Sequence, residues 1–177
     1  IIGYRANQSG TSGAGDYNTG VGSQCLGQQN ATTGGNNSCL GAGTLAYCSS
    51  GNANVAMGYN ALTLLTTGAN NVAIGTSAAD AMAVGESENI AIGTSALGGM
   101  DEGTAGGDID GNIAIGHGAL VGGDLAGNDR QIQDNIAIGE NALNSTSDNA
   151  QTGAIAIGAD ALTAATTATA NTAIGYK

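Results

Sequence analysis

One short pattern, Asn-x-Ala-Ile-Gly-x-x-Ala-Leu, recurs along this chain and limits its possible folds more than any other feature. The pattern aligns on a glycine that follows an aliphatic residue or Met, and ten positions fit it: Gly3, Gly22, Gly41, Gly58, Gly75, Gly93, Gly116, Gly139, Gly158 and Gly175. Successive glycines are 17 to 23 residues apart. Such repeats are typical of solenoids, in which each unit buries its apolar side chains by stacking on its neighbours. We therefore expect a single repeat array over residues 1–177.

Further columns of the alignment indicate how one copy folds. We assign the most regular aliphatic–glycine pairs to the core of the repeat: Ile74 and Gly75, Ile92 and Gly93, Ile115 and Gly116, Ile138 and Gly139, Ile157 and Gly158. Asn precedes the glycine by four residues in most copies, among them Asn54, Asn71, Asn89, Asn112, Asn135 and Asn171. Stacked asparagines are expected to form a ladder of amide hydrogen bonds along the array. Only Ala154 breaks this column.

The residues before each glycine are expected to form a short β-strand. Val72 and Ile74 are two residues apart and share one face of such a strand, while Asn71 and Ala73 share the other. The glycine then allows a corner because it has no Cβ. We expect the aliphatic, Gly and Asn columns to line a narrow tube. A degenerate copy at 81–85 suggests two strand-like sides per coil. The expected fold is all-β, a parallel β-solenoid of about ten coils.

The composition suits a thin, regular interior. The chain contains 32 Gly and no Pro, Trp or Phe, whereas a globular core is usually filled with large side chains at high density. The Gly, Ser and Asn content alone would be compatible with disorder, but ten copies of a pattern with aliphatic columns argue against it. A helical solenoid would need a 3.6-residue periodicity and few glycines, and the sequence has neither.

The charged residues exclude some classes of partner. The net charge is −11, and the basic residues are Arg5, Arg130 and Lys177. Three cations are too few to follow a nucleic-acid backbone, so we expect no nucleic-acid partner. No run of 18 apolar residues occurs, so we expect no membrane span.

The sequence offers little for catalysis, and we predict that the chain is not an enzyme. The single histidine, His117, lies between two glycines, where a solvated side chain is expected. No nucleophile elbow, phosphate loop or H-E-x-x-H motif occurs. Asp108 and Asp110 lie in a Gly-rich segment and are the one weak candidate for a calcium site. We otherwise expect no cofactor.

The three cysteines lie in the first third of the chain. Cys25, Cys39 and Cys48 form no C-x-x-C pair, so neither a zinc site nor a thioredoxin-like motif is indicated. Cys25 and Cys39 occupy positions that hold Ala in most other copies, which favours small buried hydrophobes. A disulfide between coils is the alternative, and it would indicate an extracellular or virion setting.

The motif resembles the head repeats of trimeric autotransporter adhesins (YadA-like heads) and the related repeats of bacteriophage tail fibres. The adhesin repeat typically has Ser-Val-Ala-Ile-Gly and shorter coils. Asn-Thr-Ala-Ile-Gly-Tyr at 171–176 and Gly-Tyr-Asn-Ala-Leu at 58–62 are closer to the phage-fibre version. The resemblance covers nearly the whole chain. It implies a left-handed parallel β-roll, three identical chains side by side about one axis, and a role in attachment.

These features lead to three hypotheses for function. We expect a structural and adhesive segment of a viral, phage-type tail or surface fibre, located on the virion surface or outside the cell. The alternative is the head of a bacterial trimeric adhesin. A third hypothesis is a fibre-borne glycan depolymerase, which would need paired carboxylates at a groove.

The length variation of the repeat indicates where a receptor would be contacted. The two 23-residue repeats place insertions at 98–111 and 121–134. We expect these insertions to contact a glycan or protein receptor, because binding residues are often carried on loops. The chain begins inside one copy and stops inside another, which leads us to expect that it belongs to a longer fibre polypeptide.

Overall fold

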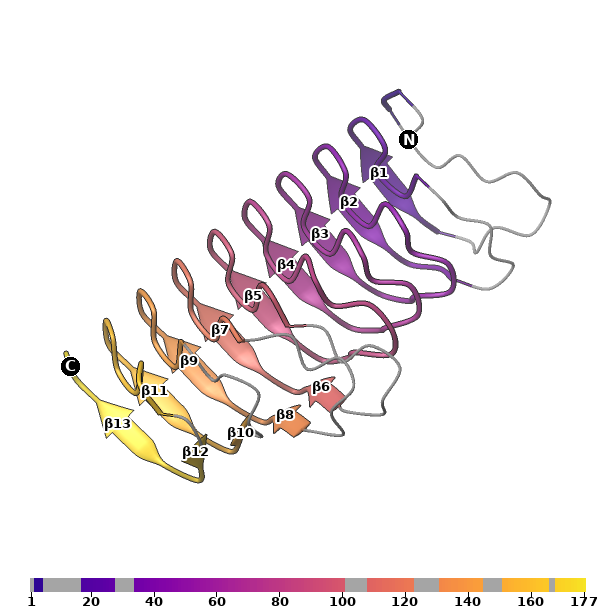
Figure 1. The fold of residues 1–177 in the computed structure, drawn as a ribbon. Coiled ribbons are helices and arrows are strands. Elements are labelled where there is room, and N and C mark those ends of the chain that lie inside the picture. The colour runs from indigo at the N-terminus through magenta and orange to yellow at the C-terminus, as the bar shows by residue number, and fades with distance from the viewer. Residues whose placement is uncertain are drawn as a thin grey trace.

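The computed structural model describes residues 2–4, 17–27, 34–100, 108–122, 131–144, 151–165 and 168–177. In these residues the chain is all-β, and its parallel strands stack as a β-solenoid with the two termini at opposite ends of the stack (Figure 1). This confirms the predicted fold class. The described part contains no helix long and apolar enough to cross a membrane.

The first sheet contains one strand from nine of the ten motif copies. Its strands are β1 (Thr19–Val21), β2 (Ser38–Leu40), β3 (Val55–Met57), β4 (Val72–Ile74), β5 (Ile90–Ile92), β7 (Ile113–Ile115), β9 (Ile136–Ile138), β11 (Ile155–Ile157) and β13 (Thr172–Ile174), paired in that order. Equivalent motif positions pair directly, as Ala73 with Ala91 and Ile74 with Ile92. The first copy joins through an isolated bridge between Ile2 and Val21.

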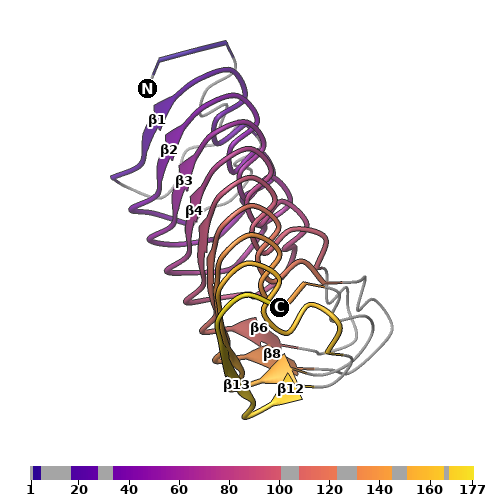
Figure 2. The ribbon, with the colours of Figure 1, turned by 90° about the vertical axis from the view of Figure 1, so that its left-hand side faces the viewer.

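A second, shorter sheet forms the opposite side of the C-terminal coils. It contains β6 (Asp108–Asp110), β8 (Gln131–Gln133), β10 (Gln151–Thr152) and β12 (Ala168–Thr169), in the order β12-β10-β8-β6. Figure 2, turned by 90°, shows the successive coils stacked behind one another, with β6, β8 and β12 near one end of the stack.

The expectation of a second strand at 81–85 is wrong. Residues Ala81–Gly85 contain turn, irregular and bend residues but no strand. The Ala83 amide donates to the Glu86 carboxylate oxygen Oε1 at 3.0 Å instead of joining a ladder. Within the part of the chain that the structure describes, strands on this second side form only in the C-terminal coils, as β6, β8, β10 and β12. In the described residues of the earlier coils, this side has only an isolated bridge between Asn52 and Ala69.

The aliphatic column lies on the outer face of the first sheet, contrary to our expectation, whereas the Asn column is buried as expected. Val72 and Ile74 do share one face, but it is the outer one: Ile74 is 37% exposed and Ile92 36%, whereas Ala73 and Ala91 are 0% and 1% exposed. Ile115, Ile138 and Ile157 are half-buried on the same outer face. The assignment of these isoleucines to the core is therefore wrong. Only the small Ala side chains point inward from these strands, because the large core side chains come from the opposite wall of the coil.

The larger core side chains come from the corners and the opposite wall. The Leu column that follows the motif glycines is fully buried in most copies: Leu26, Leu45, Leu62, Leu97, Leu120 and Leu143. The opposite wall contributes Leu65, Met82, Met100, Ile109 and Ile132, each with no exposed surface. These residues form one buried core cluster with the small Ala column.

The motif glycines turn the corner in one shared conformation. All ten have φ between +127° and +143°, a region that side chains with a Cβ rarely adopt. A Cβ on Gly93 would also lie 2.5 Å from the carbonyl oxygen of Gly116 in the next coil. The glycine column therefore permits both the turn and the close stacking of successive corners.

Candidate interaction faces

The asparagine column forms a ladder inside the solenoid. Both the backbone amide and Nδ2 of Asn71 donate to Oδ1 of Asn54, at 3.0 and 3.1 Å. Asn71 Nδ2 also donates across the coil to the carbonyl of Glu86 at 2.8 Å. The same ladder runs through Asn18, Asn37, Asn54, Asn71, Asn89, Asn112 and Asn135. These amides join the two walls of each coil, so the column is structural.

The ladder ends at the copy in which Asn is replaced. The Ala154 amide donates to Asn135 Oδ1 at 2.9 Å, and Ala154 has no side-chain amide to continue the chain. Asn171, which we expected to be a member, lies beyond this break and is exposed. The buried Gln151 faces the same rung, and its carbonyl accepts from Asn135 Nδ2 at 2.9 Å.

The outer side of the first sheet is a continuous apolar surface, which we call the aliphatic face. Its side chains are those at the first and third positions of each strand, and from β3 to β11 they are Val55, Met57, Val72, Ile74, Ile90, Ile92, Ile113, Ile115, Ile136, Ile138, Ile155 and Ile157. At β1 and β2 the first position holds Thr19 and Ser38, and a hollow of about 260 Å³ lies over this end. Sequence reasoning missed this face because strand alternation identifies two faces without saying which one is inside.

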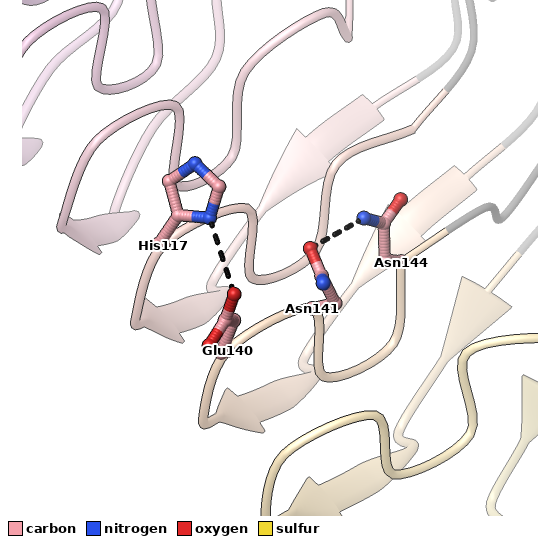
Figure 3. Close-up of polar contacts among 4 residues, drawn as sticks. All are labelled: His117, Glu140, Asn141 and Asn144. Carbon is pink, nitrogen blue, oxygen red and sulfur yellow. Dashed lines mark hydrogen bonds and ion pairs between the residues drawn. The ribbon is translucent and has the colours of Figure 1, made fainter.

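A polar ridge lies at the corners that follow β7 and β9 (Figure 3). His117 Nδ1 lies 3.9 Å from Glu140 Oε1 of the next coil, and both side chains are about two-thirds exposed. Asn144 Nδ2 donates to Asn141 Oδ1 at 3.0 Å. An ion pair as exposed as this one adds little stability. His117 is solvent-accessible, and the ridge offers donors and acceptors to a polar partner.

The two weak calcium candidates lie on a strand. Asp108 and Asp110 flank the buried Ile109 on β6, so both carboxylates point outward. Asp110 Oδ1 accepts from the Ser87 amide at 2.6 Å, and Asp108 Oδ2 accepts from Gln133 Nε2 at 3.3 Å. Across the part of the chain that the structure describes, no three His, Cys, Asp or Glu side chains gather in a way that could hold a metal ion.

The electrostatic environment of Asp110 is unfavourable for a charged carboxylate. Desolvation by burial raises its pKa above the usual value, although the hydrogen bond from Ser87 opposes this. The neighbouring charges of Asp108, Glu88 and Asp134 raise the pKa further. This edge is therefore a site of like-charge repulsion between coils.

The insertions at 98–111 and 121–134 lie only partly in the described residues, because 101–107 and 123–130 fall outside them. A hollow of about 410 Å³ lies at their bases, lined by Leu64, Ala81, Gly98, Gly99 and Val121, with the polar side chains of Asp80 and Ser95. Leu64, Ala81 and Gly99 occupy equivalent positions in successive coils, and their side chains decrease in size in that order. The hollow is shallow and largely open to solvent.

The cysteines are buried, and two of them are joined. Cys25 and Cys39 form a disulfide, with their Cα atoms 6.2 Å apart. The disulfide alternative is thus the one that the structure shows. Cys48 is a free buried thiol, and burial raises its pKa.

Comparison with protein-family models, curated proteins and solved structures finds no match for this chain.

Proposed function

We propose that this chain is a structural and adhesive segment of a viral, phage-type tail or surface fibre that acts as a homotrimer outside the cell. The observation that supports this most is the aliphatic face, which follows the first sheet along the stack. A stack of short coils cross-linked by the Asn ladder is a stiff spacer. The resemblance of the motif to fibre and adhesin repeats adds the role in attachment.

The aliphatic face supports the trimer because its apolar side chains are exposed to solvent in the single chain and would be buried by association. Side chains such as Leu40, Met57 and Ile74 are 37% to 47% exposed in the single chain. Contiguous apolar surface of this kind marks an interaction site. Homo-oligomers most often have closed symmetry, in which the same face of each copy is buried. Three copies about one axis would cover this face and leave the polar ridge at His117 and the hollow at Leu64 available to a receptor.

The trimer is tested by mass in solution. We expect Ile115→Lys to give a lower-mass species in analytical ultracentrifugation, because Ile115 lies on the aliphatic face. The matched control is Thr94→Lys, at an exposed corner of the neighbouring coil, which should keep the trimer mass. A monomeric wild-type protein at micromolar concentration would refute the homotrimer.

The receptor is proposed to be a surface glycan or protein. The hollow between Leu64 and Val121 combines apolar walls with the Asp80 carboxylate and the Ser95 hydroxyl, which is the mixture that small-ligand sites use. The head of a bacterial trimeric adhesin is the alternative, since it would use the same faces. Flanking sequence distinguishes the two, because an adhesin has a membrane-anchoring β-barrel after its repeats.

We propose no enzymatic activity and no cofactor. A glycan depolymerase would release reducing ends from a bacterial polysaccharide, and a positive reducing-end assay with the purified chain would establish that function in place of ours. Loss of activity on replacing Asp80 or Glu140 would then identify the catalytic carboxylates.

A further inference from the structure

The two bonded cysteines and one glycine depart together from the pattern of the repeat. The centre of each strand in the first sheet holds Ala from β3 onwards, but β1 has Gly20 and β2 has Cys39. Gly20 and Cys39 are register partners in adjacent strands. Cys25 lies at the corner that follows β1, where most other copies have a buried Ala. The three departures therefore meet at one place inside the N-terminal coils.

The space at Gly20 is the space that the disulfide occupies. A Cβ on Gly20 would lie 2.6 Å from Cys25 Sγ and 3.2 Å from Cys39 Sγ. Gly20 has no positive φ, so its backbone does not require glycine. It is buried, and a buried strand position normally favours a residue with a side chain. The absence of a side chain at Gly20 is thus explained by the two sulfur atoms.

We propose that Gly20, Cys25 and Cys39 form a redox-dependent lock on the N-terminal coils. When oxidised, the disulfide joins the corner after β1 to β2 and fills the space that Ala fills in other coils. When reduced, the two thiols still occupy this space, but the covalent link between the corner and β2 is absent. The stability of this end of the solenoid then depends on the oxidation state of one cysteine pair.

The oxidant is a small disulfide such as oxidised glutathione. The thiolate of one cysteine attacks a sulfur of the small disulfide, its S–S bond breaks, and one small thiol leaves with a proton. The second cysteine then attacks the mixed disulfide and releases the second small thiol. Two protein thiols are oxidised and one small disulfide is reduced. Because Cys25 and Cys39 are 0% and 4% exposed, exchange requires the N-terminal coils to be open.

A double-mutant cycle tests the lock. With Cys25 and Cys39 present, Gly20→Ala should lower the thermal midpoint by about 3 °C or more, or prevent the disulfide, because its methyl group meets the sulfur atoms. In the Cys25→Ala/Cys39→Ala background the same substitution should raise the midpoint, because it restores the alanine pattern. The same sign in both backgrounds would refute the coupling.

A thiol count and hydrogen exchange complete the test. After refolding with oxidised glutathione, denatured protein should have one alkylatable thiol, Cys48, and all three after reduction. Three thiols after oxidative refolding would overturn the proposal. Reduction should accelerate amide exchange in 19–40 and leave the coils at 136–157 unchanged. Equal acceleration in both regions would show that the disulfide is not a local lock.

Discussion

At the scale of single residues, the two most regular columns of the repeat have different physical tasks. The glycine column allows the backbone to turn at each corner, since its φ values and the close approach of the next coil both exclude a Cβ. The asparagine column provides hydrogen-bond partners for buried backbone groups on both walls of the coil. Buried polar groups are costly when they have no partner, which explains why a polar residue recurs inside so small a core.

Replacing a motif glycine should destabilise the solenoid strongly. In Gly93→Ala the new methyl group would lie 2.5 Å from the Gly116 carbonyl oxygen, in a backbone conformation with φ of +132°. We expect a loss of about 3 kcal/mol or more in the free energy of unfolding, measured by urea denaturation. Gly153→Ala is the control, because its new methyl group would have no atom within 4 Å apart from its own residue and its two chain neighbours. It should cost about 1 kcal/mol for its positive φ. Equal losses would contradict the close-stacking argument.

Removing one side-chain amide from the ladder should lower the free energy of unfolding by more than the contribution of its own hydrogen bonds. Asn89→Ala leaves the Ile109 carbonyl and the Asn112 amide without the partners that Asn89 supplies at 2.6 and 3.0 Å. Two unsatisfied buried groups predict a loss of roughly 2–4 kcal/mol, measured by thermal unfolding. Asn171→Ala, at an exposed position outside the ladder, should change the stability by less than about 0.5 kcal/mol.

At the scale of elements, the corner after each strand is more unusual than the strand. The Leu of the repeat adopts a left-handed conformation, with φ of 50° at Leu62, 53° at Leu97 and 50° at Leu120. This conformation is unfavourable for Leu by about 1–2 kcal/mol. Complete burial of the side chain offsets that cost. The corner is thus held by packing, and no turn propensity of Leu would have predicted it.

The edge of β6 should make stability depend on pH. The pKa of Asp110 is raised in the folded state by desolvation first and by neighbouring carboxylates second. The folded protein therefore holds this proton more tightly than the unfolded chain, so this contribution to stability is present at low pH. It is lost as the pH rises from the unfolded pKa near 3.8 through the folded value.

Asp110→Asn should remove that dependence. The amide keeps an oxygen to accept from Ser87 but has no charge to repel Glu88 and Asp134. We expect the variant to be more stable than wild type at pH 7 and to match it at pH 3, measured by thermal unfolding across pH. Asp160→Asn, at a corner away from β6, serves as the control. A stability gain for Asp110→Asn that is equal at both pH values would argue against the carboxylate charge as its cause.

At the scale of the whole molecule, the solenoid has three different surfaces and two different ends. The aliphatic face follows the first sheet, polar side chains cover the outer side of β6 and β8, and a polar ridge follows the corners. The N-terminal end contains the disulfide, while β13 lies beyond the last rung of the Asn ladder. Because each coil contacts only its neighbours, local changes are expected to act locally. An oligomer built on the aliphatic face would couple the coils along the full stack.

The sequence by itself determined the period, the parallel in-register stacking and the asparagine ladder. These follow from spacing alone, because a side chain that recurs at the same place in every coil must stack on its own copies. The tertiary structure decided which face of the strands is inside. Alternation places Ile74 opposite Ala73 but is symmetric between in and out, and only the opposite wall, with Leu65 and Met82, settles that the small residue points inward. Only the tertiary structure shows that Gly20 makes room for the disulfide, since the space beside Gly20 is filled by sulfur atoms from two successive coils.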